Sequence, residues 1–370
     1  MAHAQDRIAT RRRAALHGRA QLARPPGGAG QLRMVAAWAQ PDGWPGLGYG
    51  KPRPVLTPAS RPVPDVTVPT GDLGATRILV AARSTENLDA ASDIYAMAPD
   101  GSARINLTRH PAVDDNASWS PDGRRIAFAS SRGRARDQRD IYVMDADGGN
   151  PTRVTDGAAR YEMPKWSPVD DRILLSSDRA GTYDIYVIRA DGTGLRSLNP
   201  SRGQDIAADW SPDGARVVFE SDRTRPGGDG MTDIYVVDAD GGRLTNLTNS
   251  DANDHLPSFS PDGARVAFQS FRDGNSEIYT MHADGAGQTR MTDYAGEDTF
   301  ASFSPDGTRI LFQSDREGGS QHFSMFPDGS DIRRVTTGAY YQDGSSAWSP
   351  FPPAAADSLS PAPPLLSSSQ

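Results

Sequence analysis

The sequence predicts an all-β protein, a six-bladed β-propeller of four-stranded antiparallel blades. The first observation is a triplet, aromatic-Ser-Pro, whose six copies are spaced by 47, 44, 49, 44 and 45 residues. The copies begin at Trp119, Trp166, Trp210, Phe259, Phe303 and Trp348. The second is an Asp-Gly pair that closes a strand-like run in every unit. A fixed period of this length is typical of stacked repeats.

Each unit contains four short runs in a constant order. The aromatic-Ser-Pro triplet ends the first run, and a β-branched residue such as Ile126 marks the second, seven residues after Trp119. The third resembles Asp140-Ile141-Tyr142-Val143, and a short fourth run ends in a pair such as Val154-Thr155. Alternating β-branched and aromatic runs indicate strands, and Asp-Gly supplies the positive φ angles of a tight hairpin.

The six units do not coincide with six complete stretches of chain. The first unit, residues 76–108, lacks its inner strand, and the last inner strand, around Trp348, has no strands after it. We therefore expect one blade to combine three strands from residues 76–108 with a fourth from residues 343–350. Radial stacking then buries both faces of every sheet, with the tryptophans as wedges between blades.

Composition divides the chain into three parts. Residues 1–72 are rich in Arg and Pro, and we expect a disordered segment and linker there. Residues 73–350 form the propeller, and the Pro- and Ser-rich residues 351–370 are expected to be a disordered tail.

Charge and composition exclude several functions. The net charge is −8, although residues 1–75 sum to +6, so the propeller is acidic and is not expected to bind nucleic acid. The absence of cysteine excludes disulfides and thiolate chemistry. No apolar run is long enough for a transmembrane segment, and no segment fits a secretion signal. The expectation is a monomer.

The repeats resemble those of the TolB-like β-propeller family, a WD-like type of repeat, over residues 76–350. The strings that carry the resemblance are Trp-Ser-Pro-Asp-Gly, Ser-Asp-Arg and Asp-Ile-Tyr-Val-Met-Asp-Ala-Asp-Gly. TolB is a periplasmic protein of the bacterial Tol–Pal envelope system and works by binding proteins. The resemblance implies a non-enzymatic scaffold with a protein or peptide partner, in a periplasmic or other extracytoplasmic setting.

Two enzymatic alternatives remain open. One is a small-molecule hydrolase of the lactonase type, which also uses six blades and holds a divalent ion in the channel. The other is an accessory propeller related to prolyl oligopeptidase-type enzymes. No nucleophile elbow, phosphate loop or dinucleotide fingerprint is present, so no catalytic residue and no cofactor are predicted.

One column of residues is a candidate binding ring. Five residues before the aromatic anchors, and at the next position, polar side chains recur: Asp114, Asp115, Glu162, Asp205, Asp254, His255, Asp298 and Asp343. Because this position opens the inner strand, repetition would gather them at one mouth of the channel. There they could bind Ca²⁺, which prefers several oxygen ligands, or a basic partner segment. The alternative is that each Asp bonds backbone amides of its own turn.

A second column consists of arginines thirteen residues after the anchor. We expect them to pair across a hairpin with the acid before Ile-Tyr, as Arg132 with Asp140, Arg179 with Asp184, Arg223 with Asp233 and Arg272 with Glu277. The fifth complete unit departs from this pattern, since Gln321-His322-Phe323 replaces Asp-Ile-Tyr. Function is expected where the repetition fails: here, in the longer loops 133–139 and 224–232, and in the uneven members of the ring.

Overall fold

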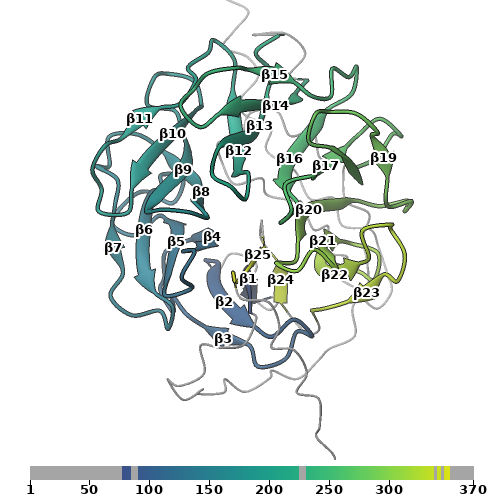
Figure 1. The fold of residues 1–370 in the computed structure, drawn as a ribbon. Helices are drawn as coiled ribbons and strands as arrows, with labels where there is room; N and C mark the ends of the chain where they lie inside the picture. The colour runs from purple at the N-terminus through teal and green to yellow at the C-terminus, as the bar shows by residue number, and fades with distance from the viewer. Residues whose placement is uncertain (1–76, 85–90, 225–230, 337–339, 343–345, 351–370) are drawn as a thin grey trace, which may run out of the picture. The chain divides into compact units, whose positions relative to one another are not determined.

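The computed structural model describes residues 77–84, 91–224, 231–336, 340–342 and 346–350, and within them the chain is built of strands. Six sheets surround a central axis, so the predicted six-bladed propeller is confirmed (Figure 1). The segments 1–72 and 351–370, Asp343 and part of the 224–232 loop lie outside the described residues. No helix in the described ranges is long and apolar enough to cross a membrane.

Blades 2 to 6 each follow the chain from the inner to the outer strand. Blade 2 is β4 (Asp114–Trp119), β5 (Arg125–Ser130), β6 (Asp140–Asp145) and β7 (Thr152–Arg153). Blade 3 is β8 (Tyr161–Trp166), β9 (Arg172–Ser177), β10 (Asp184–Arg189) and β11 (Arg196–Ser197). Blade 4 is β12 (Asp205–Trp210), β13 (Arg216–Ser221), β14 (Asp233–Asp238) and β15 (Thr245–Asn246). Blade 5 is β16 (Asp254–Phe259), β17 (Arg265–Ser270), β18 (Glu277–His282) and β19 (Thr289–Arg290). Blade 6 is β20 (Asp298–Phe303), β21 (Ile310–Ser314), β22 (Gln321–Met325) and β23 (Arg333–Arg334).

Blade 1 joins the two ends of the propeller sequence, as predicted. Its strands are β1 (Ile78–Ser84), β2 (Asp93–Met97), β3 (Ile105–Asn106), β24 (Tyr340–Gln342) and β25 (Ala347–Trp348). Both β24 and β25 pair with β1, so the closing strand begins earlier than expected and is made of two pieces. Trp348 lies opposite Ile78, and the amide of Ser349 donates to the carbonyl of Arg77 at 2.7 Å.

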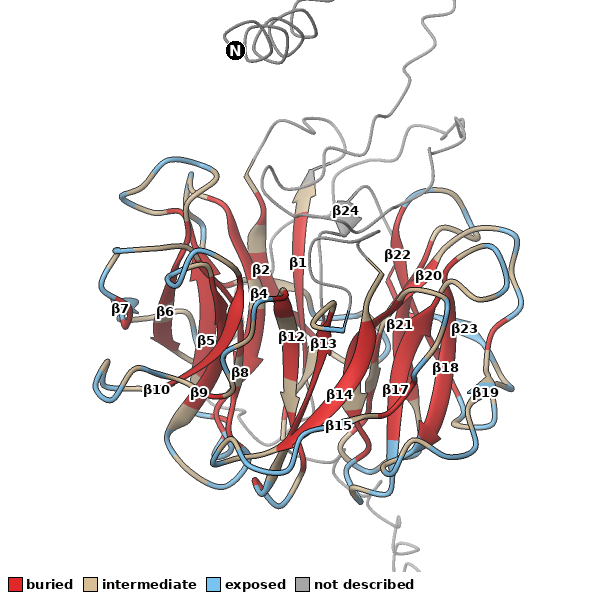
Figure 2. Cartoon of the chain, turned by 90° about the horizontal axis from the view of Figure 1, so that it is seen from above, coloured by how far each residue is buried: buried red, intermediate tan, exposed pale blue. Residues whose placement is uncertain are grey.

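The apolar core lies between blades. The first three strands of blades 2 to 6 are largely buried, while the loops at the two ends of the ring are partly exposed (Figure 2). Trp166 of blade 3 packs against Ala127 and Ile141 of blade 2, which confirms the tryptophan as a wedge. The Arg125 guanidinium lies 4.8 Å from the centre of the Trp166 ring. The Arg172–Trp210 and Arg216–Phe259 pairs repeat this contact at the next two junctions.

The Asp-Gly glycines satisfy a second constraint that the hairpin alone does not impose. Gly192 has φ of 85° and Gly285 has φ of 90°, as the hairpin requires. A Cβ at Gly192 would meet the carbonyl oxygen of Val154 in the preceding blade at 2.9 Å, and one at Gly285 would meet that of Leu247 at 2.6 Å. Glycine is therefore needed both for the turn and for the contact with the preceding blade.

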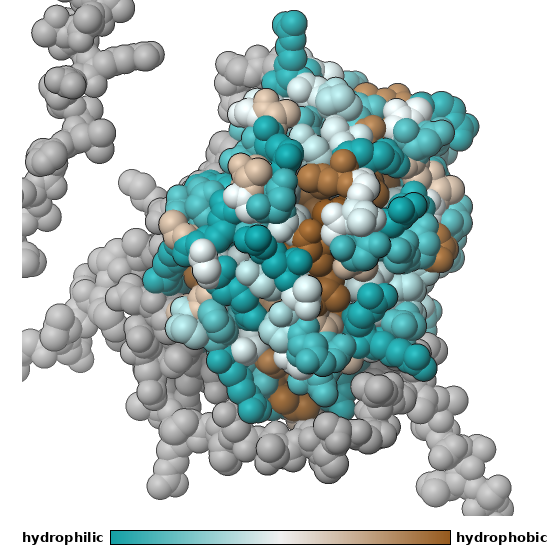
Figure 3. All heavy atoms as spheres, turned by 90° about the vertical axis from the view of Figure 1, so that its left-hand side faces the viewer, coloured by the Kyte–Doolittle hydropathy of each residue, from teal (hydrophilic) through white to brown (hydrophobic). Residues whose placement is uncertain are grey.

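The outer edges of the blades are short and polar. Each of β3, β7, β11, β15, β19 and β23 has two residues, and Arg153, Arg333 and Arg334 are exposed there. Figure 3 shows one flank of the ring, where hydrophilic residues surround a narrow apolar band. Short, charged edge strands oppose edge-to-edge pairing with other chains.

Removing residues 342–370 should destabilise the whole propeller, because β1 would lose β25 and the ring would stay open. We expect the melting temperature to fall by about 10 °C or more, since lost closure affects every blade junction. Removing residues 1–72, or only 351–370, should leave it nearly unchanged. Thermal unfolding followed by circular dichroism measures this, and an unaltered melt of the 342–370 deletion would refute the closure.

Candidate functional site

The first residue of four inner strands is a fully buried aspartate. These residues are Asp114, Asp205, Asp254 and Asp298. Each lies opposite a serine of the second strand, as Asp205 lies opposite Ser221. The Ser221 hydroxyl donates to the Asp205 carboxylate at 2.5 Å, and Ser130 does the same to Asp114. The serine thus fills one of the acceptor sites that burial removes from water.

The arginine column supplies the second partner. Arg223 Nη2 lies 2.6 Å from Asp205 Oδ2, and its guanidinium lies 4.9 Å from the Phe219 ring and 5.3 Å from the Tyr235 ring. Three further blades repeat the ion pair, as Arg132–Asp114 at 2.8 Å, Arg272–Asp254 at 3.1 Å and Arg316–Asp298 at 2.6 Å. The arginine is held between a carboxylate and aromatic rings of its own blade.

The expected pairing of these arginines with the acid before Ile-Tyr is therefore wrong. In blade 2, Thr155 Oγ1 at the end of the unit donates to Asp140 at 2.7 Å, and in blade 3 the amide of Ser201 donates to Asp184 at 3.1 Å. In blade 6, the fifth complete unit, Thr336 donates to Gln321 in the same way. The replacement of Asp by Gln in that blade thus preserves the local hydrogen bond.

Blade 3 departs from the column because Tyr161 replaces the aspartate. Its arginine, Arg179, turns to the more exposed Asp156 at 2.7 Å and donates to the Tyr161 hydroxyl. Hydrogen bonds from Tyr161, Ala158 and Arg179 outweigh the effect of burial and lower the pKa of Asp156 to about 2. The Arg179–Asp156 ion pair is therefore solvent-exposed, unlike the arginine–aspartate pairs of the other blades.

Burial raises the pKa of each aspartate in the column, against the effect of its arginine and serine. For Asp205 the loss of solvation raises the pKa to about 6, although Arg223 and Ser221 lower it. All four carboxylates are fully buried, and each is paired with an arginine of its own blade.

The next position along the inner strands fastens neighbouring blades together. Arg139 of blade 2 contacts Asp115 at 3.0 Å and reaches Glu162 of blade 3 at 3.4 Å. His255 Nδ1 of blade 5 lies 3.3 Å from Glu220 Oε1 of blade 4. Sequence reasoning missed Arg139 and Glu220, because they belong to loop and second-strand positions that differ between the units.

The predicted ring is therefore only partly assembled. Arg139 brings Asp115 and Glu162 together, while Asp114, Asp205, Asp254 and Asp298 are held within their own blades. Among the residues that the structure describes, no three His, Asp or Glu side chains are placed to hold a metal ion. Binding of a basic partner at this mouth stays a prediction.

The third position of each inner strand was not anticipated. Its residues have left-handed backbone with φ of 51° to 55°: Asn116, Met163, Ala207, Leu256 and Phe300. A register shift accompanies it, as between His255 and Ser258. Met163, Ala207 and Leu256, from three different blades, form one apolar cluster against which Phe300 packs. These residues belong to the inner strands, which surround the axis of the ring (Figure 1).

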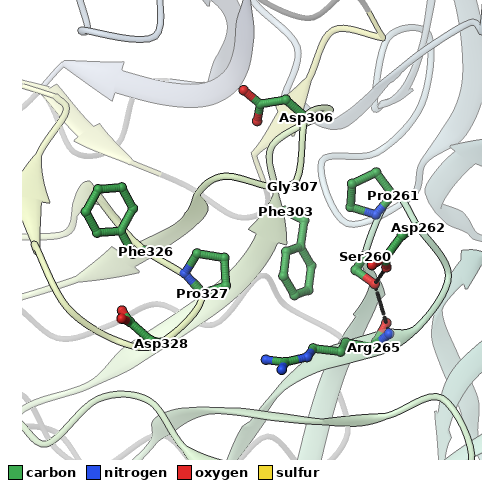
Figure 4. Close-up of a pocket in the computed structure, with 10 residues that line it drawn as sticks. All are labelled: Ser260, Pro261, Asp262, Arg265, Phe303, Asp306, Gly307, Phe326, Pro327 and Asp328. Carbon is green, nitrogen blue, oxygen red and sulfur yellow. Dashed lines mark hydrogen bonds between the residues drawn. The ribbon is translucent and has the colours of Figure 1, made fainter.

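A groove of about 720 Å³ lies at the opposite end of the inner strands, between blades 5 and 6. Pro261 and Arg265 come from blade 5, while Phe303, Phe326 and Pro327 come from blade 6 (Figure 4). The groove therefore combines two aromatic rings with two prolines.

Phe326 is where the repetition fails at this groove. The five equivalent hairpin positions carry Ala98, Asp145, Arg189, Asp238 and His282. Phe326 is 41% exposed, and the guanidinium of Arg309 lies 4.3 Å from the centre of its ring. Arg309 is in turn paired with Asp331. One face of the ring is thus supported while much of the side chain stays exposed.

Carboxylates surround this aromatic groove. Asp262, Asp306 and Asp328 each accept a backbone hydrogen bond within their own turns. Hydrogen bonds from Ser260 and Ser330 lower the pKa of Asp262 and of Asp328, so both are ionised at neutral pH. The exposed Arg265 is the one cation that lines the groove, which leaves an excess of negative charge.

A family model settles the relationship of the chain to known proteins. The model described as the TolB beta propeller domain matches residues 75–180, 159–255, 226–292 and 253–351. The chain belongs to the TolB β-propeller family. No curated protein matches the chain.

Several solved structures share the fold of this chain. TolB from Acinetobacter baumannii has a TM-score of 0.64 and 21% identity over 75% of this chain and 67% of that one. A putative TolB from Agrobacterium tumefaciens has a TM-score of 0.59 and 24% identity, over 75% of this chain and 95% of that one. Hydrazine synthase from Kuenenia stuttgartiensis has a TM-score of 0.61 and 14% identity, over 76% of this chain and 47% of that one. Identities this low establish the fold alone.

Within this TolB-type propeller, Arg223→Met should cost about 3–5 kcal/mol of unfolding free energy, because it leaves the Asp205 carboxylate buried without its cation. The matched change Arg179→Met, at the same repeat position, should cost at most about 1 kcal/mol because that pair is solvated. Chemical denaturation measures both. Equal losses would contradict the distinction between the two blades.

The raised pKa of Asp205 predicts a pH dependence of stability. Since the folded pKa of about 6 exceeds the ordinary 3.8, protonation favours the folded state. This contribution is fully present below pH 4 and is lost as the pH rises through 6. The melting temperature of Asp205→Asn should therefore rise relative to that of the native protein as the pH increases from 4 to 7.

Asp156→Asn is the control for this pH dependence, because the pKa of Asp156 is lowered and its contribution is lost only as the pH falls towards 2. The difference in melting temperature between Asp156→Asn and the native protein should stay constant between pH 4 and 7. A constant difference for Asp205→Asn as well would show that Asp205 is ionised throughout.

Proposed function

We propose that this chain is a non-enzymatic scaffold that binds a protein or peptide through its propeller. The observation that carries the proposal is the groove beside Phe326, an exposed phenyl ring at a position where no other blade has Phe, Tyr or Trp. Exposed aromatic anchors beside a pocket are typical of binding hot spots. By its family, we propose a partner in the bacterial cell envelope.

The side chains around the axis favour binding over a channel-bound metal hydrolase. A Ca²⁺ site needs several oxygen ligands directed at one point. Met163, Ala207 and Leu256 instead form an apolar cluster where inner strands of three blades meet. The aspartates of the column are engaged by arginines of their own blades. Both arrangements support the scaffold over the lactonase-like alternative.

The chemistry of the groove indicates the kind of peptide. Phe303, Phe326 and two prolines offer an apolar floor, which suits an extended segment with proline or another apolar residue. Asp262, Asp306 and Asp328 favour a basic residue beside it. We therefore propose an extended peptide that combines apolar and basic residues as the ligand.

Selection from a display library of random 15-residue peptides on the immobilised full chain tests this function. We expect peptides with proline and Lys or Arg, whose binding falls at least tenfold in Phe326→Ala. Leu244→Ala is the matched control, because Leu244 is 39% exposed on a hairpin of blade 4. Absence of enriched peptides, or equal binding to Phe326→Ala, would refute the groove as the site that binds a partner.

Calcium titration with a thermal-shift readout tests the enzymatic alternative on the same protein. Added Ca²⁺ should not raise the melting temperature. A rise that disappears in Asp205→Asn/Asp254→Asn would support a metal at the mouth, and lactone hydrolysis by that metal-bound protein would favour the hydrolase.

A further inference from the structure

We propose that the groove beside Phe326 is occupied by residues 50–64 of the same chain. This inference rests on the proposed function, because it requires the groove to be a peptide-binding site, and it adds an internal ligand that competes with any partner. The segment reads Gly-Lys-Pro-Arg-Pro-Val-Leu-Thr-Pro-Ala-Ser-Arg-Pro-Val-Pro.

The composition of the segment matches the groove in two respects. It has five prolines, which favour the extended polyproline conformation that aromatic-lined grooves recognise. It also carries Lys51, Arg53 and Arg61 and no acidic residue. The groove has the opposite charge, with three carboxylates and the single cation Arg265. Proline on the aromatic rings and cations on the carboxylates can be satisfied together.

The point where the chain enters the propeller lies on the same face as the groove. Arg77, which precedes β1, bonds to Ser349 through both backbone and side chain. Ser349 occupies the position of Ser304, which bonds to Arg309 in the same manner. The chain therefore enters beside the turn of blade 1 that corresponds to the groove-lining turns of blades 5 and 6.

The tether is long enough to reach the neighbouring blade. Strand β25 of blade 1 lies against β20, which ends in Phe303 of the groove. The residues 65–76 that link the segment to Arg77 span about 37 Å if fully extended as polyproline. A tether of this length gives an effective concentration in the millimolar range, so a weak intrinsic affinity suffices.

The charge of the segment decides between it and the other proline-rich part of the chain. Residues 351–370 also contain several prolines but have one acidic residue, Asp357, and no Lys or Arg. Their charge is the same in sign as the excess charge of the groove. Residues 50–64 are the better ligand on electrostatic grounds.

Cross-linking of the full chain tests the docking, because the protein has no cysteine of its own. Ser60→Cys is combined with Ser330→Cys at the rim of the groove, and a short bismaleimide joins them. The control pair is Ser60→Cys with Ser102→Cys. Ser102 occupies the same hairpin position in blade 1, where the chain enters, and donates to Asp100 as Ser330 does to Asp328.

We expect the intramolecular yield at Ser330→Cys to exceed that at Ser102→Cys at least fivefold. Phe326→Ala should abolish the difference, and Leu244→Ala should preserve it. The excess yield at Ser330→Cys should fall when the three cations of the segment are removed, in the triple variant Lys51→Gln/Arg53→Gln/Arg61→Gln. These substitutions lie outside the propeller. Salt at 1 M should also reduce the excess. Equal yields at the two sites, or no effect of these changes on the yields, would overturn the proposal. Cross-links that form only between chains would also overturn it, because they would indicate a second copy of the chain as the occupant.

The two proposals fail separately. Foreign peptides that bind at Phe326 without any cross-linking advantage at Ser330→Cys would leave the scaffold function intact and refute the internal ligand. The opposite result is a strong excess of cross-linking at Ser330→Cys while no foreign peptide binds, even to the variant that lacks the charges of residues 50–64. It would show a site for internal docking alone and refute the scaffold function.

Discussion

Each blade is a sheet with two apolar faces, and only its neighbours can cover both of them. The arrangement of the molecule follows from this need. A wedge such as Trp166 fills the space between consecutive sheets, and the Asp-Gly glycines let each hairpin approach the preceding blade closely. The ring must close for the same reason, because an open ring would leave two apolar faces in water. Blade 1 meets this requirement by joining β1 to β24 and β25.

Burial on both faces also explains how the polar side chains behave. A carboxylate that opens an inner strand loses its solvation, so it needs partners within reach, as Asp205 has in Ser221 and Arg223. Groups paired in this way are part of the framework. At the ends of the blades, Asp262, Asp306 and Asp328 bond only within their own turns, while 41% of the Phe326 side chain stays exposed.

The blades and their closure could be predicted because strand periodicity and hairpin glycines repeat in the sequence itself. The partner of Arg223 could not, because the chain folds back past the end of β13 to reach Asp205 instead of its hairpin neighbour. The left-handed residues were also hidden, since nothing about Met163 or Leu256 as residue types favours positive φ. Phe326 could have been found, because an alignment of the six Asp-Gly hairpins shows it as the exception.

The closure of blade 1 has a consequence for synthesis of the protein. Ser349 bonds to Arg77 across a separation of 272 residues, so the strand that completes the ring is made last. At the usual rate of ribosomal elongation, β1 waits roughly 15 to 50 seconds for its inner partner. Throughout that time its inner edge can pair with other strands. The nascent chain is therefore most prone to misassociation before its final blade is complete, and a chain that terminates before β25 would leave the ring open.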